Sequence, residues 1–154
     1  MNEFYLIEKH INEIQIKVEF YQDLYGTKES TKVLNSTFPE CFSLIQGSLL
    51  FEIICRTCNL FDNAKINGSK NLTLEHLISI SGDAFPYELD LKYKELTDKF
   101  KSKELKKFRN KYYAHYDLNM KMKMKRISIN INYEYLKTLL SDMHDFVRKL
   151  GLNS

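Results

Sequence analysis

The sequence contains few residues that interrupt regular secondary structure. Only two prolines and five glycines occur among its 154 residues, a scarcity that favours long helices over a turn-rich β fold. Its three cysteines are an odd number, which excludes a complete internal disulfide framework. A reducing, cytoplasmic setting is therefore expected.

Signals for export and for membrane insertion are also lacking. The first residues carry acidic and polar side chains instead of the basic start and apolar core of a signal peptide. The most apolar stretch, residues 44–58, is too short to span a bilayer and contains Gln46, Glu52 and Arg56. The sequence therefore predicts a protein that is neither exported nor embedded in a membrane.

What the sequence does have is enough apolar and aromatic material for one core. Hydrophobic residues make up 44% of the chain, with ten Tyr and ten Phe, which argues for a packed globule and against disorder. A domain of 154 residues buries about two-thirds of its unfolded surface. Because the sequence shows no repeat and no interdomain linker, we expect a single domain over residues 1–154.

Apolar residues recur at spacings of three and four through most of the chain, which is the period of an amphipathic helix. This pattern predicts an all-α bundle of about five helices with short connections. The expected helices cover residues 2–25, 40–61, 73–80, 87–116 and 132–150. The second of them is apolar on almost every side and is expected to be the central, most buried helix.

Residues typical of helix termini stand at the ends of these segments. Thr73 and Asn132 can each cap the first turn of the helix that follows. Pro39 suits the first turn of a helix, and Gly26 and Gly151 suit positions just beyond a last turn.

The connections between the helices are predicted to be irregular or extended. Residues 27–37 are polar and are expected to form a loop with a short turn, and residues 62–71 are expected to form another loop. A phase slip near Ser102-Lys103 predicts a kink or break in the fourth helix. Alternating methionine and lysine predict an extended segment over residues 120–131, as a short strand or a hairpin with a bulge.

Basic residues are concentrated between residues 101 and 126. This segment holds ten Lys or Arg and two acidic residues, a net charge of +8, whereas the rest of the chain has 13 basic and 18 acidic residues, a net charge of −5. So uneven a distribution indicates a polyanionic partner that docks on one region. The alternative is a solvated, lysine-rich helix face.

The segment that best suggests chemistry lies within this basic region. Residues 108–117 read Phe-Arg-Asn-Lys-Tyr-Tyr-Ala-His-Tyr-Asp, so Arg109 is followed by the polar Asn110 and, after five intervening residues, by His115. This order resembles the motif of the HEPN superfamily, in which an arginine is followed by four to six residues and then a histidine.

The resemblance extends beyond that motif to about residues 40–150. Leu-Phe-Asp at residues 60–62 ends an apolar helix, and Leu-Thr-Leu at residues 72–74 follows a polar loop. Together with the arginine and histidine, these segments resemble the abortive-infection U-type branch of HEPN proteins. The resemblance implies an all-helical fold, usually a homodimer, and often a metal-independent endoribonuclease activity that serves as a toxin or antiviral device.

The family's arginine, polar residue and histidine correspond to Arg109, Asn110 and His115, which are therefore the expected catalytic residues. The resemblance implies no metal and no cofactor, and its implied partners are RNA and an antitoxin, of nucleotidyltransferase type or another. Many relatives paired with a nucleotidyltransferase have a tyrosine two residues after the histidine. Asp117 stands there in this chain, which argues against regulation through modification of such a tyrosine.

The two residue types suit RNA cleavage without a metal. A histidine titrates near neutral pH and can activate the ribose 2′-hydroxyl or protonate the leaving 5′-oxygen. An arginine stays charged and binds phosphate oxygens bidentately. We therefore expect transesterification to a 2′,3′-cyclic phosphate, with His115 in proton transfer and Arg109 on the scissile phosphate. DNA lacks the 2′-hydroxyl and would not be cut by this route.

Helical geometry bears on how many copies of the chain are needed. Six steps of about 100° along a regular helix place Arg109 and His115 roughly 120° apart around the helix axis. One subunit would then not focus both groups on one phosphate, whereas two copies facing each other across a two-fold axis would form a composite cleft. The competing outcome is a monomeric, inactive protein.

Further basic and aromatic residues of the region are expected to contact RNA, through phosphate charge or base stacking. These residues are Lys107, Lys111, Tyr113, Tyr116, Lys121, Lys123 and Arg126. Solvated lysines, and tyrosines buried in the core or in a dimer interface, are the alternatives.

The principal residues also have structural interpretations. His115 shares a face with Phe108 and Tyr112 and could be a buried structural histidine, and Arg109 could pair with Glu104 or Asp117. The alternative functions are a non-catalytic HEPN module that binds RNA, a nucleotide or a partner protein, and a plain helical interaction domain.

Two further pairs lie on the apolar helix. Cys55 and Cys58 are expected to be packing residues, because no second pair of ligands has the spacing of a zinc site. Glu52 and Arg56 form an i,i+4 pair, which is expected to be a structural salt bridge; the alternative is that the pair orients the Arg109–His115 motif from behind.

Overall fold

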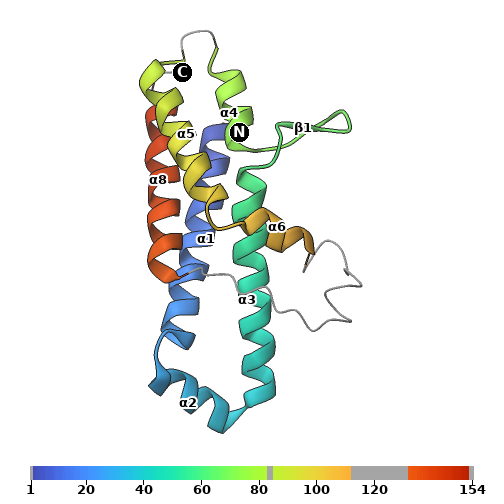
Figure 1. Cartoon of the computed structure of the whole chain (residues 1–154), viewed down its shortest axis with the longest axis vertical. Helices are drawn as coiled ribbons and strands as arrows, with labels where there is room; N and C mark the ends of the chain where they lie inside the picture. The colour runs from blue at the N-terminus through green and yellow to red at the C-terminus, as the bar shows by residue number, and fades with distance from the viewer. Residues whose placement is uncertain (1, 83–84, 112–131, 153–154) are drawn as a thin grey trace.

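The computed structural model describes residues 2–82, 85–111 and 132–152 (Figure 1). The described residues form an all-α bundle of seven helices with one two-stranded hairpin. The elements are α1 (Glu3–Tyr25), α2 (Lys28–Thr37), α3 (Pro39–Leu60), β1 (Lys65–Ile66), β2 (Ser69–Lys70), α4 (Leu74–Ile80), α5 (Tyr87–Lys101), α6 (Leu105–Arg109) and α8 (Tyr133–Gly151). The all-α prediction is confirmed. The predicted extended segment at residues 120–131 lies outside the described residues.

Helices α1 and α8 pack along each other and carry much of the core. Helix α1 begins at the cap Asn2, whose side chain accepts a hydrogen bond from the Phe4 backbone, and α8 begins at Asn132, which accepts one from Tyr135. All seven apolar residues on one face of α8 are buried: Leu136, Leu139, Leu140, Met143, Phe146, Val147 and Leu150. Each such burial contributes about 1.5–3 kcal/mol. The last helix is thus confirmed, although it continues through Gly151, which was expected to lie beyond its end.

The prediction that residues 27–37 form a loop is wrong, because α2 occupies them. Thr27 caps this helix, accepting a hydrogen bond from the Ser30 backbone, and none of the residues of α2 is buried. A helix whose only large apolar residues are Val33 and Leu34 has no continuous apolar stripe from which to predict it. Figure 1 shows α2 connecting the lower ends of α1 and α3.

The prediction that α3 is the most buried helix is also wrong. Its buried residues all lie in the C-terminal half: Ile53, Ile54, Thr57, Cys58 and Leu60. Leu44, in the N-terminal half, is 73% exposed, because α3 extends below the end of α8 (Figure 1). Residues 44–58 were expected to be too short to span a bilayer, but the helix that contains them, α3, is long and apolar enough to cross a membrane by length and composition alone. Of its most apolar window, 22% is buried in the bundle.

The predicted loop at residues 62–71 contains an antiparallel hairpin, β1 with β2. Asn67 and Gly68 both have positive φ, 51° and 86°, as a two-residue hairpin turn of type I′ requires. The Asn-Gly pair in the sequence was the available signal. The Glu75 carboxylate accepts a hydrogen bond from the Ala64 backbone at 2.6 Å, and Thr73 caps α4 as predicted.

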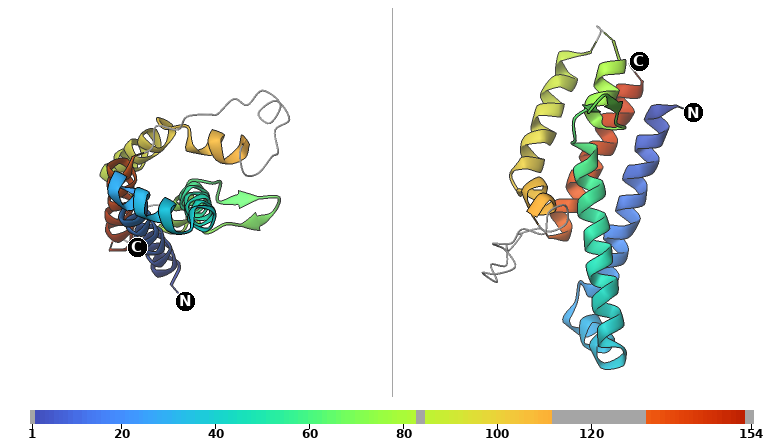
Figure 2. Two further views of the ribbon diagram at one scale, coloured as in Figure 1. Left: turned by 90° about the horizontal axis from the view of Figure 1, so that it is seen from below. Right: turned by 90° about the vertical axis from the view of Figure 1, so that its right-hand side faces the viewer.

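The break predicted near Ser102-Lys103 is confirmed. Helix α5 ends at Lys101, Glu104 adopts a left-handed backbone with φ of 51°, and α6 then begins at Leu105. Figure 2 shows α6 and the hairpin projecting on the same side of α3. The break therefore redirects the chain so that the end of α6 faces the end of α3.

Candidate functional site

Arg109 is held at the point where α6 meets the C-terminal end of α3. Leu105 and Phe108 are buried and anchor α6 to the core. Phe61, the residue before Asp62, stacks on Phe100 with ring centroids 4.1 Å apart, which fixes the backbone next to Asp62. The Arg109 side chain is 16% exposed, so it is largely enclosed while one edge reaches solvent.

Asp62 is the principal partner of Arg109. Nη1 of Arg109 donates to Asp62 Oδ2 at 2.7 Å, and Nη2 donates to Asp62 Oδ1 at 3.2 Å. Lys106 Nζ lies 2.9 Å from the same Oδ1 atom. A bidentate arginine–carboxylate pair is among the strongest and most directional contacts available to a guanidinium. Arg109 is thus fixed by an acid 47 residues earlier in the chain.

The remaining donors of the guanidinium are also largely committed. Nη1 donates to Asn59 Oδ1 at 3.3 Å, and Nε donates to Asn110 Oδ1 at 3.2 Å. Since an arginine has five N–H donors, one N–H on Nη2 has no acceptor among the described residues. Asn110, the polar residue of the motif, therefore orients Arg109 from its own chain segment.

The electrostatics of the pair follow from these contacts. Burial acts to raise the pKa of the Asp62 carboxyl, but hydrogen bonds from Arg109 and Lys106 outweigh it and hold that pKa below its usual value. The hydrogen bonds that Arg109 donates to Asp62 raise the pKa of Arg109 above its usual range, against the opposing effect of burial. The site at neutral pH is therefore an ionised carboxylate between two cations.

The lowered pKa of Asp62 predicts how stability depends on pH. A carboxyl whose pKa is lower in the folded chain stabilises the fold above its ordinary value of 3.8, and this contribution is lost as pH falls through the folded-state pKa. The wild type should therefore exceed Asp62→Asn in free energy of unfolding at pH 7, and the difference should shrink toward pH 3. Urea unfolding of both proteins at pH 7, 5, 4 and 3 measures it; a difference that stays constant would contradict the pairing.

The expected structural pairing of Arg109 with Glu104 is wrong. Glu104 accepts from Lys107 at 2.7 Å instead, and Asp117 lies outside the described residues. Asp62 was recognised only as part of the Leu-Phe-Asp segment of the family pattern, without a role. That segment was the one sequence signal that could have identified it, because nothing local connects residue 62 to residue 109.

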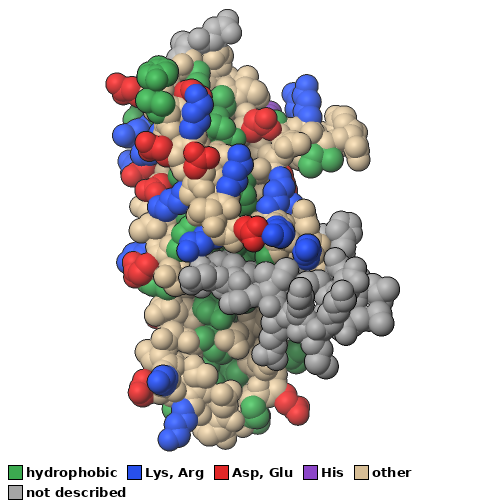
Figure 3. Space-filling view, in the orientation of Figure 1, with side chains coloured by type: hydrophobic (Ala, Val, Ile, Leu, Met, Phe, Trp, Pro, Cys, Tyr) green, Lys and Arg blue, Asp and Glu red, His purple; other side chains and the backbone are tan. Residues whose placement is uncertain are grey.

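The other residues predicted to act on RNA are only partly within the described structure. Lys107 is exposed and paired with Glu104, and Lys111 is half-buried just beyond α6. Six others lie outside the described residues: Tyr113, His115, Tyr116, Lys121, Lys123 and Arg126. Figure 3 shows Lys and Arg side chains gathered over α5 and α6, with acidic side chains among them.

Glu52 and Arg56 contact helix α1 rather than Arg109. Arg56 Nε lies 2.9 Å from Glu52 Oε1, and Arg56 Nη1 lies 2.6 Å from Glu13 Oε2. Lys17 Nζ completes the network 3.5 Å from Glu52. The expectation of a structural salt bridge agrees with this arrangement, which ties α3 to α1.

The cysteines differ in exposure, and this predicts their reactivity. Burial raises the pKa of the Cys58 thiol to about 12 and raises that of Cys55 as well, while Cys41 is exposed. Because the thiolate is the nucleophile, iodoacetamide at pH 8 should alkylate Cys41 first and Cys58 only after unfolding. Mass mapping of the labelled peptides in native and denaturing buffer measures this order. Native labelling of Cys58 at the rate of Cys41 would contradict the packing described here.

Comparison with known proteins identifies one family. A family model named HEPN_AbiU2, described as AbiU2, matches residues 2–153 of the chain. No curated protein and no solved structure matches the chain significantly. Among the described residues, no group of three or more His, Cys, Asp or Glu side chains is placed to hold a metal ion.

Proposed function

The chain belongs to the AbiU2 branch of the HEPN superfamily, and from this membership we propose that it is an endoribonuclease that cuts RNA as an abortive-infection effector. The observation that carries the proposal is the fixed guanidinium of Arg109. It is held by Asp62, Asn59 and Asn110 at the surface of the bundle, six residues before His115. A cation preorganised in this way stabilises negative charge that develops on a phosphate without needing to move.

The proposed reaction is an internal transesterification. An imidazole of His115 takes the proton of the ribose 2′-hydroxyl while the 2′-oxygen forms a bond to phosphorus. The bond from phosphorus to the 5′-oxygen breaks, and an imidazolium gives that oxygen its proton. Arg109 stabilises the additional charge on the phosphate oxygens in the transition state. The products are a 2′,3′-cyclic phosphate and a free 5′-hydroxyl.

Two copies of the chain are proposed to form the site. The sequence separation of Arg109 and His115 would place them roughly 120° apart on a regular helix, which favours a two-fold arrangement in which one imidazole acts as base and the other as acid. Sedimentation at micromolar concentration tests this, and a clean, active monomer would defeat it. We further propose a cytoplasmic setting and an antitoxin that restrains the enzyme.

A non-catalytic HEPN module is the second candidate, and one observation favours it. Four of the five N–H donors of Arg109 already have acceptors within the described residues. A phosphate would therefore meet one remaining donor, or would have to displace Asp62 from part of its bidentate contact. Such an arginine could equally serve as a structural element beneath a binding surface.

The experiment that separates the two candidates is cleavage in the absence of metal. Purified protein is incubated with total RNA and with transfer RNA in EDTA, beside a DNA oligonucleotide of the same sequence as one RNA substrate. The enzyme should cut only RNA and leave termini that are blocked to ligation until the cyclic phosphate is removed. RNA that remains intact while still binding the protein would support the non-catalytic module.

A further inference from the structure

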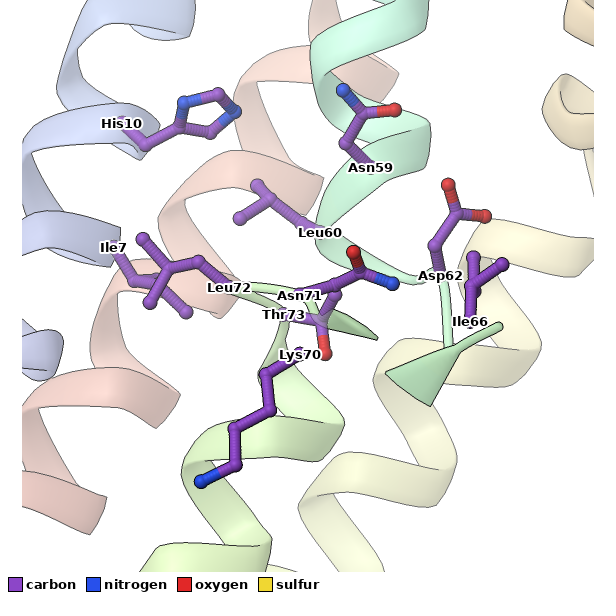
Figure 4. A pocket seen from close by; sticks show the side chains of 10 residues that line it. All are labelled: Ile7, His10, Asn59, Leu60, Asp62, Ile66, Lys70, Asn71, Leu72 and Thr73. Atoms are coloured by element: carbon purple, nitrogen blue, oxygen red, sulfur yellow. The ribbon is translucent and has the colours of Figure 1, made fainter. Parts of the chain in front are cut away.

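A pocket of about 440 Å³ opens beside Arg109 and is not used by the proposed reaction. It lies between α1, the end of α3 and the segment that leads from the hairpin into α4 (Figure 4). Its lining residues are Ile7, His10, Asn59, Leu60, Asp62, Ile66, Lys70, Asn71, Leu72 and Thr73. Its volume is within the range of pockets that bind small ligands, about 300–1,000 Å³.

The pocket shares two residues with the Arg109 site. Asn59 and Asp62 line it, and both accept hydrogen bonds from the Arg109 guanidinium. A ligand inside the pocket would therefore lie one side chain away from the position proposed for the scissile phosphate. The pocket and the Arg109 guanidinium therefore form one continuous surface, joined by Asn59 and Asp62.

The pocket offers polar groups at one edge and apolar groups on its walls. Figure 4 shows the His10 ring and the Asn59 amide facing each other, with the Asn59 nitrogen toward His10 and its oxygen turned away. Asn59 Oδ1 accepts from Arg109, whereas Asn59 Nδ2 has no acceptor in the part of the chain that the structure describes. Ile7, Leu60 and Leu72 supply apolar surface.

His10 presents its imidazole ring to this pocket. Burial lowers the pKa of His10 below its ordinary value, so the ring is neutral at pH 7. Its Nε2 lies 3.4 Å from the carbonyl oxygen of Arg56, a contact that requires the proton on Nε2 and leaves Nδ1 as an acceptor. An amide donor, a neutral imidazole ring and apolar walls together suit a flat heteroaromatic ring with polar edges.

We propose that this pocket binds a nucleobase of the RNA. The base belongs to the nucleotide next to the phosphate that Arg109 contacts. The proposal rests on the proposed function, which places that phosphate, and it adds a basis for base preference to an otherwise sequence-independent reaction. The exposed Lys70, which also lines the pocket, provides a cation for a neighbouring phosphate. His10 and Asn59 are then specificity residues rather than catalytic ones.

Nucleotide binding to the pocket can be tested without cleavage. The full-length protein, labelled at histidine, is titrated with 5′-AMP, GMP, CMP and UMP, none of which contains a bond that the enzyme could cut. The imidazole resonance of His10 should shift saturably with at least one of the four, and that of His144, which lies on α8, should not. Shifts absent at His10 with all four nucleotides would overturn the proposal.

Two variants alter the pocket in different ways. His10→Ala removes the imidazole ring, and Leu72→Trp is designed to fill the pocket from a side chain that is 39% exposed and lies outside the core cluster. Each should weaken binding of the preferred nucleotide about tenfold or more, with the thermal midpoint as the check on folding. His144→Ala is the matched control and should bind as wild type does. Wild-type affinity in both pocket variants would contradict the proposal.

A comparison of probes distinguishes RNA from a free nucleotide as the source of the base. An uncleavable 2′-O-methyl trinucleotide should bind at least about tenfold more tightly than the mononucleotide, because it adds phosphate contacts. Mononucleotide binding that is equally tight would overturn the assignment to RNA. Saturable shifts at His10 in a protein that cuts no RNA would refute the proposed nuclease activity but support nucleotide binding in the pocket. Cleavage of RNA without those shifts would support the nuclease activity and refute nucleotide binding in the pocket.

Discussion

Replacing His115 by alanine is expected to lower the rate of RNA cleavage by about 10²–10⁴-fold, the usual contribution of a general acid or base. His115 of one copy serves in one proton transfer of the proposed reaction and His115 of the other copy in the second, so the substitution removes both groups and the loss should approach the upper end. The rate constant is measured under single-turnover conditions, with the termini of the products identified. His144→Ala is the matched control and should cut RNA as wild type does.

The stability of the His115→Ala protein decides between a catalytic and a structural histidine. If His115 faces solvent in a cleft, its loss should change the free energy of unfolding by less than about 0.5 kcal/mol and the thermal midpoint by less than about 2 °C. A buried histidine with hydrogen-bond partners would cost more, about 1–3 kcal/mol. A protein that is inactive because it has partly unfolded would favour the helical interaction domain.

The parts of the fold that could be predicted from the sequence are those in which one helix face decides the outcome. The apolar face of α8 is fully buried, and its cap at Asn132 and the break before α6 follow from local patterns. Helix α2 could not be predicted, since none of its residues is buried and a cap at Thr27 is its main local signal. The extent to which α3 is buried depends on where α8 ends, and the sequence of α3 alone does not indicate this.

The candidate site shows the same division. Arg109 and Asn110 could be identified from the motif, because the family resemblance attaches to residue order. The partnership with Asp62 is tertiary and joins residues 47 positions apart. The pocket at His10 is tertiary as well, since it combines α1 with the residues that follow α3. Sequence patterns in a single chain indicate which residues carry chemistry better than which residues orient them.

Removing the Asp62 carboxylate is expected to lower the rate of RNA cleavage more than any other substitution except His115→Ala. Asp62→Ala should lower the rate constant for cleavage by about 10²-fold, the cost of misplacing a catalytic group by about 1 Å, with little change in KM. Asp62 does not contact the reacting atoms in the proposed reaction, so it is a positioning residue for Arg109. An increase in cleavage would instead mean that Asp62 withholds Arg109 from the phosphate.

The same substitution should also destabilise the fold, because it leaves Arg109 and Lys106 without their shared acid. The side chains of Arg109 and Asp62 are 16% and 18% exposed. We therefore expect the substitution to lower the free energy of unfolding by about 1–3 kcal/mol, which is less than the cost of breaking a fully buried pair. Asp142→Ala provides the matched control: Asp142 also pairs with a cation at 2.6 Å, but it is 45% exposed and should cost less than about 1 kcal/mol.

A double-mutant cycle with Arg109→Ala isolates the pairwise contribution. If the bidentate contact accounts for the destabilisation, the double variant should be less destabilised than the sum of the two single variants, by about 0.5–3 kcal/mol. Additivity would mean that the two side chains act independently. Arg109 would then have no fixed position from which to stabilise a phosphate, and the geometric basis of the proposed nuclease would be lost.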